Sequence, residues 1–231
     1  QTNAHLSMDD VGLSGKCLVF VTPDADRTMN TFLGASADLD SSYVSEQAIV
    51  DSKYVYLEGY LVTDERSRKA VLKAKQIANQ HHAKTALTLS DPSMMMYFRD
   101  GMLEMIGEGV DLLFANEDEA NELSGSKDIN QTVESLKSHA KSFVITRGKS
   151  GALVYDGESL IEIAAHSVEA IDTLGAGDMF AGAFLYGLTH GMEYRQSAEL
   201  ASLASSQIVS QYGPRLKANQ TSELLKNFIK S

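Results

Sequence analysis

The segment that most constrains the fold of this chain is the glycine-rich junction Asp172–Phe180. An apolar-alternating stretch, 159–171, precedes it and predicts a β-strand, and a run of small and apolar residues, 179–188, follows it and predicts a helix. The chain therefore passes from strand to helix through Gly175-Ala176-Gly177, where glycine permits a sharp turn and the close approach of a ligand. The N–H groups of the first helical turn lie at the positive end of the helix dipole, so the junction predicts a phosphate site.

Asp178 follows the glycines and falls in the first turn of the predicted helix. The helix dipole stabilises a carboxylate at that position. Beside an anion site, such a carboxylate can accept the proton of a hydroxyl while that oxygen attacks a phosphoryl group. On these residues alone a second interpretation stays open, in which the glycines only pack the helix on a sheet and Asp178 only partners the dipole.

Size and charge narrow the class of protein. A chain of 231 residues can bury one core, which predicts a single α/β domain with a small appendage. The net charge of −11, without a Lys/Arg run, argues against nucleic acid and anionic membrane as partners. The single cysteine, Cys17, allows no intramolecular disulfide and fits a reducing compartment. With no apolar stretch of membrane-spanning length and no signal segment, we expect a soluble cytoplasmic protein.

The order of predicted elements indicates an α/β fold. Two β-type runs, 16–22 and 28–33, flank the turn-forming residues 23–26 and predict a hairpin that serves as a lid or an interface ribbon. Strands then alternate with helices, which implies parallel pairing with right-handed crossovers. The expected strands are 53–57, 85–89, 111–115, 143–146, 152–155 and 159–163, and the expected helices are 64–82, 94–108, 117–123, 129–140, 179–188, 193–211 and 222–229. We expect the methionines of 94–108 to fill the core.

The residues that close the strands should meet at the carboxyl edge of the sheet, where ligands bind in open α/β folds. They are Glu58, Asp91, Asn116, Arg147 and the glycine loop. The polar run 116–119 can hold a hydrated Mg²⁺, or it can be a capped helix start with acidic first-turn residues. The loop 146–151 can border a nucleotide or be a plain tight turn. The small residues of 201–205 can receive a flat ligand or pack another helix.

The run Asp172-Thr-Leu-Gly-Ala-Gly-Asp178 resembles the signature of the ribokinase-like (PfkB) family of carbohydrate and nucleoside kinases. The resemblance implies a three-layer α/β/α sandwich with a mostly parallel central sheet and a small β lid, and ATP-dependent phosphoryl transfer to an alcohol. It implies that Asp178 is the catalytic base and that the amides of Gly175, Ala176 and Gly177 form an anion hole.

Further motifs extend the resemblance along the chain. The spacing Asn116-x-x-Glu119 is similar to the family motif that places Mg²⁺ and phosphate, and it selects Glu119 over its acidic neighbours. The strand end at Glu58 resembles the one that contacts substrate hydroxyls. In the resemblance the remaining roles fall to the following residues: Arg27 at the transferring phosphoryl group, Thr146, Arg147, Gly148 and Gly151 along ATP, Ala204 and Ser205 at the adenine, and Asp172 at a monovalent cation (K⁺), as in some relatives.

The run 22–60, together with Ser90-Asp91 and 114–117, looks most like the bacterial adenosine-kinase branch. The resemblance therefore favours a nucleoside, adenosine first, as the small-molecule acceptor, with a free sugar of the ribose or fructose type as the alternative. Nothing before Gly15 matches the usual N-terminal portion of the family, with its strand, substrate-binding Asp and Gly-Gly segment. We thus expect one kinase domain, 1–231, that lacks this portion and carries a lid hairpin at 16–35 through which it can dimerise. A nucleotide-binding fragment without turnover is the other hypothesis.

Overall fold

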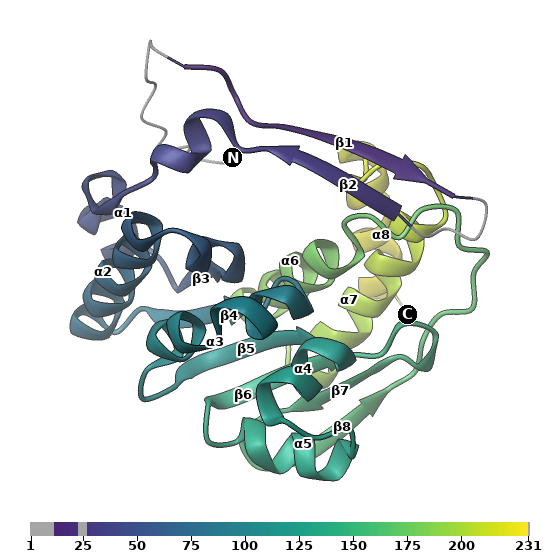
Figure 1. Cartoon of the computed structure of the whole chain (residues 1–231). Helices are drawn as coiled ribbons and strands as arrows, with labels where there is room; N and C mark the ends of the chain where they lie inside the picture. Colours follow the sequence, from purple (N-terminus) through teal and green to yellow (C-terminus); the bar gives the residue numbers. More distant parts are fainter. Residues whose placement is uncertain (1–11, 23–26, 231) are drawn as a thin grey trace. The chain divides into compact units, whose positions relative to one another are not determined.

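The computed structural model describes residues 12–22 and 27–230, and in it strands alternate with helices as the sequence predicts (Figure 1). The chain forms two compact units, unit 1 (Gln1–Cys17 and Thr31–Phe143) and unit 2 (Leu18–Asn30 and Val144–Ser231). The strands of the larger sheet follow the order β3-β4-β5-β6-β7-β8, and β1 and β2 form a separate two-stranded sheet. The predicted α/β class is confirmed, with a mixed central sheet. The single domain over 1–231 stays a prediction.

Unit 1 is built on three parallel strands whose register aligns Glu58 with Thr88 and Ala86 with Leu112. Helices follow each strand and begin where a short polar side chain accepts a main-chain N–H, as Asp64 does from Arg66 N at 2.8 Å. The elements are α1 (Glu46–Val50), β3 (Tyr54–Glu58), α2 (Glu65–His81), β4 (Lys84–Thr88), α3 (Pro92–Ile106), β5 (Val110–Asn116), α4 (Glu117–Ser124), α5 (Ile129–Leu136) and the start of β6 (Ala140–Thr146). α5 ends before the predicted residue 140 because Ala140 already belongs to β6.

Helix α3 begins at Pro92, two residues before the predicted start, because Asp91 caps it and proline suits the first helical position. The helix is kinked at Phe98, whose φ of −129° and ψ of 29° are not helical. Hydrophobic periodicity did not reveal three short 3₁₀ segments that contact α2: η1 (Gly34–Asp38), η2 (Ser41–Tyr43) and η3 (Gly59–Thr63). η3 packs against α3.

The methionines of α3 divide between core and surface. Met102 and Met105 are fully buried and Met95 nearly so, which confirms the expected core role for these three. Met96, in contrast, is 59% exposed, so the expectation was wrong for this residue. Met96 lies about 100° around the helix axis from Met95, which turns its side chain away from the buried face at this position.

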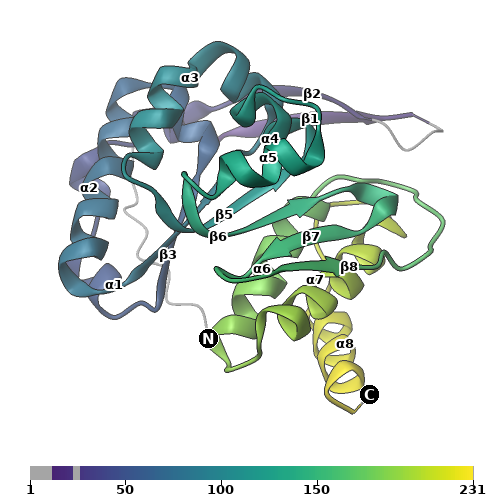
Figure 2. The ribbon, with the colours of Figure 1, turned by 90° about the horizontal axis from the view of Figure 1, so that it is seen from below.

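Unit 2 combines a β-hairpin with three helices. β7 (Ala152–Tyr155) and β8 (Leu160–Ile163) are antiparallel and joined at Asp156, whose carboxylate accepts the N–H groups of Glu158 and Ser159. Helix α7 packs against both strands and against α6 (Figure 2). The helices are α6 (Ala176–Thr189), α7 (Tyr194–Val209) and α8 (Ala218–Lys230), and the 3₁₀ turn η4 (Gly148–Ser150) follows β6.

The alternating stretch 159–171 forms a strand only at its start, which confirms the strand expected at 159–163. β8 ends at Ile163, and residues 164–171 have no regular secondary structure, so no strand leads directly into the glycine junction. The apolar residues of 164–171 were misleading because this segment forms a wall of a cavity, lined by the consecutive residues 165–168 and by Ala170, rather than a strand.

The predicted hairpin is confirmed as two strands, β1 (Lys16–Val21) and β2 (Arg27–Phe32), in a sheet of their own. Its turn, 23–26, lies outside the described residues. Leu18, Phe20 and Phe32 are each more than half exposed. Among the residues that the structure describes, no helix has the length and apolar character needed to cross a membrane.

The buried and exposed methionines of α3 give a matched test of the core. We expect Met102→Ala to lower the free energy of unfolding by about 2–5 kcal/mol, because it removes buried contacts and leaves a cavity. The exposed Met96→Ala should change it by less than about 0.5 kcal/mol. Urea unfolding of both variants measures the difference, and equal effects would contradict the assignment of Met102 to the core.

Candidate functional site

A cavity of about 380 Å³ lies within unit 2. The loop after β6, the irregular segment after β8, the start of α6 and one face of α7 form its walls. Its lining residues are Thr146, Gly148, Lys149, Gly151, Ala165, His166, Ser167, Val168, Ala170, Thr173, Ala176, Gly177, Phe180, Ser202, Ser205, Ser206 and Val209. The surface of the cavity is mostly apolar, and many of the lining side chains are small, as is typical of a pocket that receives a flat ligand.

The cavity brings together much of the predicted nucleotide site. Thr146, Gly148 and Gly151 line it on the β6 side, and Ser205 lines it on α7. A Cβ atom added to Gly148 or Gly177 would meet no atom within 4 Å, so the main chain at both glycines borders open space. The walls therefore fit the predicted close approach of phosphates to the backbone.

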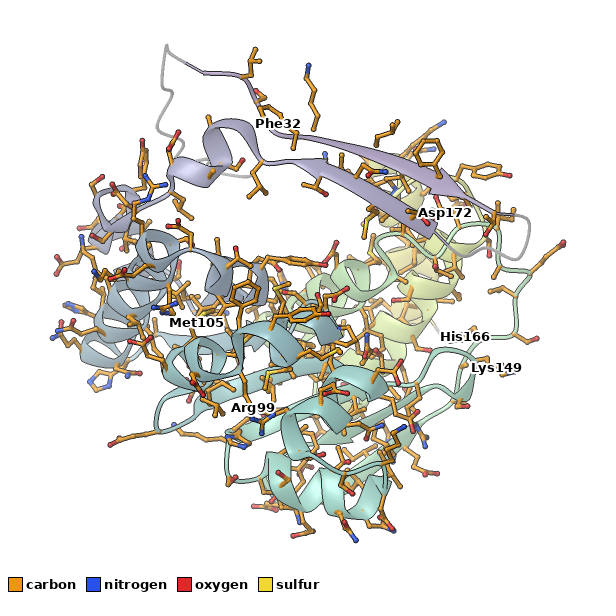
Figure 3. All side chains as sticks on the ribbon, in the orientation of Figure 1. Phe32, Arg99, Met105, Lys149, His166 and Asp172 are labelled. Atoms are coloured by element: carbon orange, nitrogen blue, oxygen red, sulfur yellow. The ribbon has the colours of Figure 1, made fainter. Side chains whose placement is uncertain are left out.

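Several lining residues were not foreseen from the sequence. The segment 165–170 forms one wall, and Lys149 on η4 and His166 after β8, both labelled in Figure 3, also line the cavity. Ser202, Ser206 and Val209 extend the α7 wall in both directions from Ser205. Their spacing of three to four residues is the signal that could have identified this face of the helix.

Two predicted nucleotide residues lie elsewhere. Ala204 is 3% exposed and packs with Leu200 and Leu224 in the core between α7 and α8, so its assignment to the adenine wall is corrected. Arg147 does not line the cavity: its Nη2 donates to Ser150 O at 3.4 Å and lies 3.9 Å from Glu162 Oε1. Small residues occur both on the face of α7 that lines the cavity and on the face that packs in the core, so their pattern did not distinguish the two faces.

The glycine junction itself depends on Gly175. This residue is the N-cap of α6 and has a φ of +78°, a conformation that side-chain-bearing residues avoid. A Cβ at this position would also lie 2.7 Å from Pro214 O, so the turn after α7 leaves no space for one. Ala176 N donates to Thr173 O at 3.3 Å. The Ala176 amide of the predicted anion hole is therefore already engaged, whereas the N–H groups of Gly177 and Asp178, in the first turn of α6, have no acceptor within the helix.

Asp172 stabilises this junction by hydrogen bonds. It is 3% exposed, and its two carboxylate oxygens accept N–H bonds from Leu174 at 2.9 Å and from Gly213 at 3.0 Å. Ile171 N and Asp172 N both donate to Val209 O, at 2.7 and 3.2 Å. Asp172 therefore joins the junction to the end of α7 and to the turn beyond it.

Ser205 makes a further link between the cavity wall and the junction. Its Oγ donates to Ala176 O at 3.0 Å. The hydroxyls of Ser202 and Ser206 likewise donate to main-chain carbonyls, of Ala164 and Leu203. The α7 wall consequently presents hydroxyl oxygens whose protons are already engaged, and it holds the first turn of α6 in place.

Asp178 stands exposed in the first turn of α6, next to Gly177 at the cavity. An exposed carboxylate at a helix N-terminus is electrostatically stabilised and accessible to a substrate hydroxyl. Arg27 begins β2, but its side chain lies outside what the structure describes. Its predicted role stays a prediction.

Unit 1 carries the second group of predicted residues, at the carboxyl edge of its parallel strands. Glu58 ends β3, Ser90 and Asp91 follow β4, and Asn116 ends β5. Ser90 Oγ donates to Glu58 Oε2 at 3.2 Å, and Asp91 caps α3 by accepting the N–H of Ser93 at 2.8 Å. The expectation that these strand ends meet at one edge is confirmed within unit 1.

Asn116 and Glu119 form a reciprocal capping box at the start of α4. Asn116 Oδ1 accepts the N–H of Glu119 at 2.8 Å, while the two oxygens of Glu119 accept from Asn116 N at 2.9 Å and Asn116 Nδ2 at 2.8 Å. Glu119 is only 5% exposed. Burial raises the pKa of Glu119 to about 7; the bond from Asn116 N opposes that rise, and the charges of Asp91 and Asp118 add to it.

Comparison with known proteins then decides the family. Residues 2–221 match the pfkB family of carbohydrate kinases. The chain belongs to this family. The structure of adenosine kinase from Sinorhizobium meliloti superposes with a TM-score of 0.88 at 34% identity, covering 92% of this chain and 66% of that one. This confirms the ribokinase-like fold that the signature 172–178 implied.

Two curated relatives of this pfkB-family chain have different acceptors in their names. A 5-dehydro-2-deoxygluconokinase from Bacillus subtilis is 29% identical in an alignment of 209 positions that covers 84% of this chain and 61% of the relative. An adenosine kinase from Schizophyllum commune is 28% identical in an alignment of 230 positions that covers 88% of this chain and 65% of the relative. The chain thus spans about two thirds of the length of the proteins it matches.

The raised pKa of Glu119 makes a pH-dependent contribution to the stability of this pfkB-family chain. The folded state binds the proton more tightly than the unfolded chain, whose glutamate has its ordinary pKa of 4.5. The resulting stabilisation is fully present below about pH 4.5 and is lost as the pH rises through about 7, in total about 3 kcal/mol. Glu119→Gln cannot titrate and can still accept the bond from Asn116 N.

We therefore expect the free energy of unfolding of Glu119→Gln, measured relative to that of the parent chain, to increase by about 2–3 kcal/mol as the pH rises from about 5 to about 8.5. Urea unfolding across this range, with EDTA present, measures the difference. Glu117→Gln, an exposed first-turn change, should follow the parent at each pH. A parent-minus-variant difference that does not change with pH would contradict the burial of a protonated Glu119.

Proposed function

We propose that this chain carries out ATP-dependent phosphoryl transfer to a primary hydroxyl of a nucleoside, with adenosine as the first candidate. The observation that carries the proposal is the cavity of unit 2, which opens onto the first turn of α6 where Gly177 and Asp178 lie. A volume of about 380 Å³ is of the size of small-molecule sites. Membership of the pfkB family supports the reaction class.

The roles follow from the chemistry of phosphoryl transfer, in which positioning and electrostatics do most of the work. The base and sugar of ATP occupy the cavity between 165–170 and the α7 wall. The N–H groups of Gly177 and Asp178 stabilise charge on the transferring phosphoryl group. Asp178 accepts the proton of the acceptor hydroxyl.

The ions of the proposal have residues that fit them. Mg²⁺ keeps most of its water and takes one or two carboxylates beside phosphate oxygens. Asn116 and Glu119 would hold the ion through its bound water, and the ion would neutralise phosphate charge. At Asp172 both oxygens already accept N–H bonds. Each retains a second lone pair, so K⁺ would add to these bonds without replacing them.

The surface around Glu58 supports a nucleoside over a free sugar. Tyr60 on η3 is 47% exposed, and Met96 and Tyr97 on the adjoining α3 are 59% and 74% exposed. A purine stacks on such side chains, while the carboxylate of Glu58 accepts ribose hydroxyls. A sugar acceptor, as in the name of the Bacillus subtilis relative, is the second candidate.

The hairpin of β1 and β2 is proposed as a lid. A two-stranded sheet is marginal in water, and Leu18, Phe20 and Phe32 expose much apolar surface, so we infer that it closes over bound substrate, brings Arg27 to the phosphoryl group and pairs with a second copy. A cytoplasmic location is part of the same proposal. The alternative is a nucleotide-binding fragment without turnover.

The proposed base is tested by Asp178→Asn. We expect turnover to fall by about 10²–10⁴-fold with little change in ATP affinity, because the amide cannot accept the proton while the cavity is intact. Coupled-assay kinetics and a fluorescent ATP analogue measure the two quantities. Glu199→Gln, an exposed change on α7, serves as control. Unchanged turnover would refute the role of Asp178, and ATP binding without any product in the parent chain would favour the non-catalytic alternative.

The proposed acceptor is tested at Tyr60. Base–aromatic stacking contributes about 1–3 kcal/mol, so Tyr60→Ala should lower kcat/KM for adenosine by about 5- to 150-fold and leave that for ribose unchanged. Tyr60→Phe keeps the ring and should resemble the parent. Preference of the parent chain for ribose over adenosine would instead establish the sugar kinase.

A further inference from the structure

The turn after β4 has a conformation that its residue does not favour. Ser90 has a φ of +69°, and Asp91 N donates across it to Leu89 O at 2.8 Å. This is a γ-turn of the rarer form, with positive φ at its centre, and it is strained for residues that carry a side chain. Among the described non-glycine residues, positive φ occurs otherwise at His82, where the end of α2 accounts for it.

Glycine would adopt the positive φ of this position at lower conformational cost. Serine adds only a hydroxymethyl group, and its Oγ donates to Glu58 Oε2 at 3.2 Å. The N–H of Ser90 in turn donates to Thr88 Oγ1 at 3.2 Å, which fixes the turn from the other side. The one evident gain from a side chain at this strained point is therefore the bond to the carboxylate of Glu58.

The neighbouring chain is shaped to permit this bond. The parallel register aligns Glu58 with Thr88, two residues before Ser90. Gly59, which follows Glu58, lies so close to the turn that an added Cβ would be 2.5 Å from Thr88 O and 2.7 Å from Leu89 O. Only a glycine at 59 lets the end of β3 approach the turn closely enough for the two side chains to meet.

We propose that Ser90 is a positioning residue that orients the carboxylate of Glu58 toward the hydroxyls of the acceptor. The inference rests on the proposed function, in which Glu58 binds those hydroxyls. The hydroxyl of Ser90 holds Oε2 and so sets the plane of the carboxylate, which determines where Oε1 lies. The strain in the γ-turn keeps the Ser90 side chain directed at Glu58, and the acceptor meets a carboxylate that is already ordered.

The test compares Ser90→Gly with the parent chain. Glycine removes the hydroxyl and relieves the strain, so the chain should fold at least as well as Ser90→Ala, which retains the strain. We expect KM for adenosine to rise by about 5- to 20-fold with KM for ATP unchanged, the loss of one hydrogen bond to a charged group. Ser90→Asn tolerates positive φ and restores a donor, and it should recover part of the lost affinity.

A double-mutant cycle with Glu58→Gln separates positioning from a direct effect. If Ser90 acts through Glu58, Ser90→Gly should raise KM for adenosine much less in the Glu58→Gln background. An unchanged KM in Ser90→Gly, or equal effects of Ser90→Gly in both backgrounds, would overturn the inference. Calorimetric titration with adenosine makes the same comparison for a chain that binds without turnover.

Failure of the proposed function can be distinguished from failure of this inference about Ser90. A parent chain that neither phosphorylates nor binds adenosine or ribose would refute the proposed function. In that case the same cycle measured by urea unfolding still tests the Ser90–Glu58 bond, since coupling between the two sites is expected only if the hydroxyl and the carboxylate are bonded.

Discussion

The N–H groups at the start of a helix need acceptors, and the way this chain supplies them organises the site. In unit 1 a short polar side chain accepts them at α2, α3, α4 and α5, through Asp64, Asp91, Asn116 and Asp128. Helix α6 differs, because its N-cap is Gly175 and no side chain accepts its first N–H groups. The acceptor side chain, Asp172, stands three residues earlier and supports the turn instead. The first turn of α6 is thereby left for an anionic ligand.

The carboxyl edge of unit 1 concentrates features that lower stability. Ser90 is held in a strained turn, and Glu119 is buried with its pKa raised to about 7. Both residues fix the side chain of a neighbour that is proposed to bind substrate or metal, Glu58 in one case and Asn116 in the other. Strain and desolvation persist at functional sites because the surrounding packing compensates for them. The well-packed core under this edge, with Leu87 and Leu113 fully buried, provides that compensation.

Local patterns predicted most of the elements of the fold, and they failed where periodicity had a second cause. The start of α2 was placed correctly after its capping residue Asp64, since a cap acts within one turn, whereas the start of α3 was missed by two residues although Asp91 caps it. Residues 164–171 were predicted to continue a strand, but the structure gives them no regular secondary structure, and five of them line the cavity. Met96 has the composition of the core but lies on the surface, because the phase of α3 is set by what packs beside it. Neither outcome is encoded within a window of a few residues.

The sequence by itself determined the family, through the run 172–178, and several of the residues that line the cavity of unit 2, because glycines and capping side chains act on their own turn of chain. Only the tertiary structure decided which face of α7 lines the cavity, with Ser205 on the wall and Ala204 in the core. It alone showed that Glu119 is buried and that Ser90 contacts Glu58, which is 32 residues away. Burial and long-range hydrogen bonds depend on residues brought together by folding, and no local pattern carries that information.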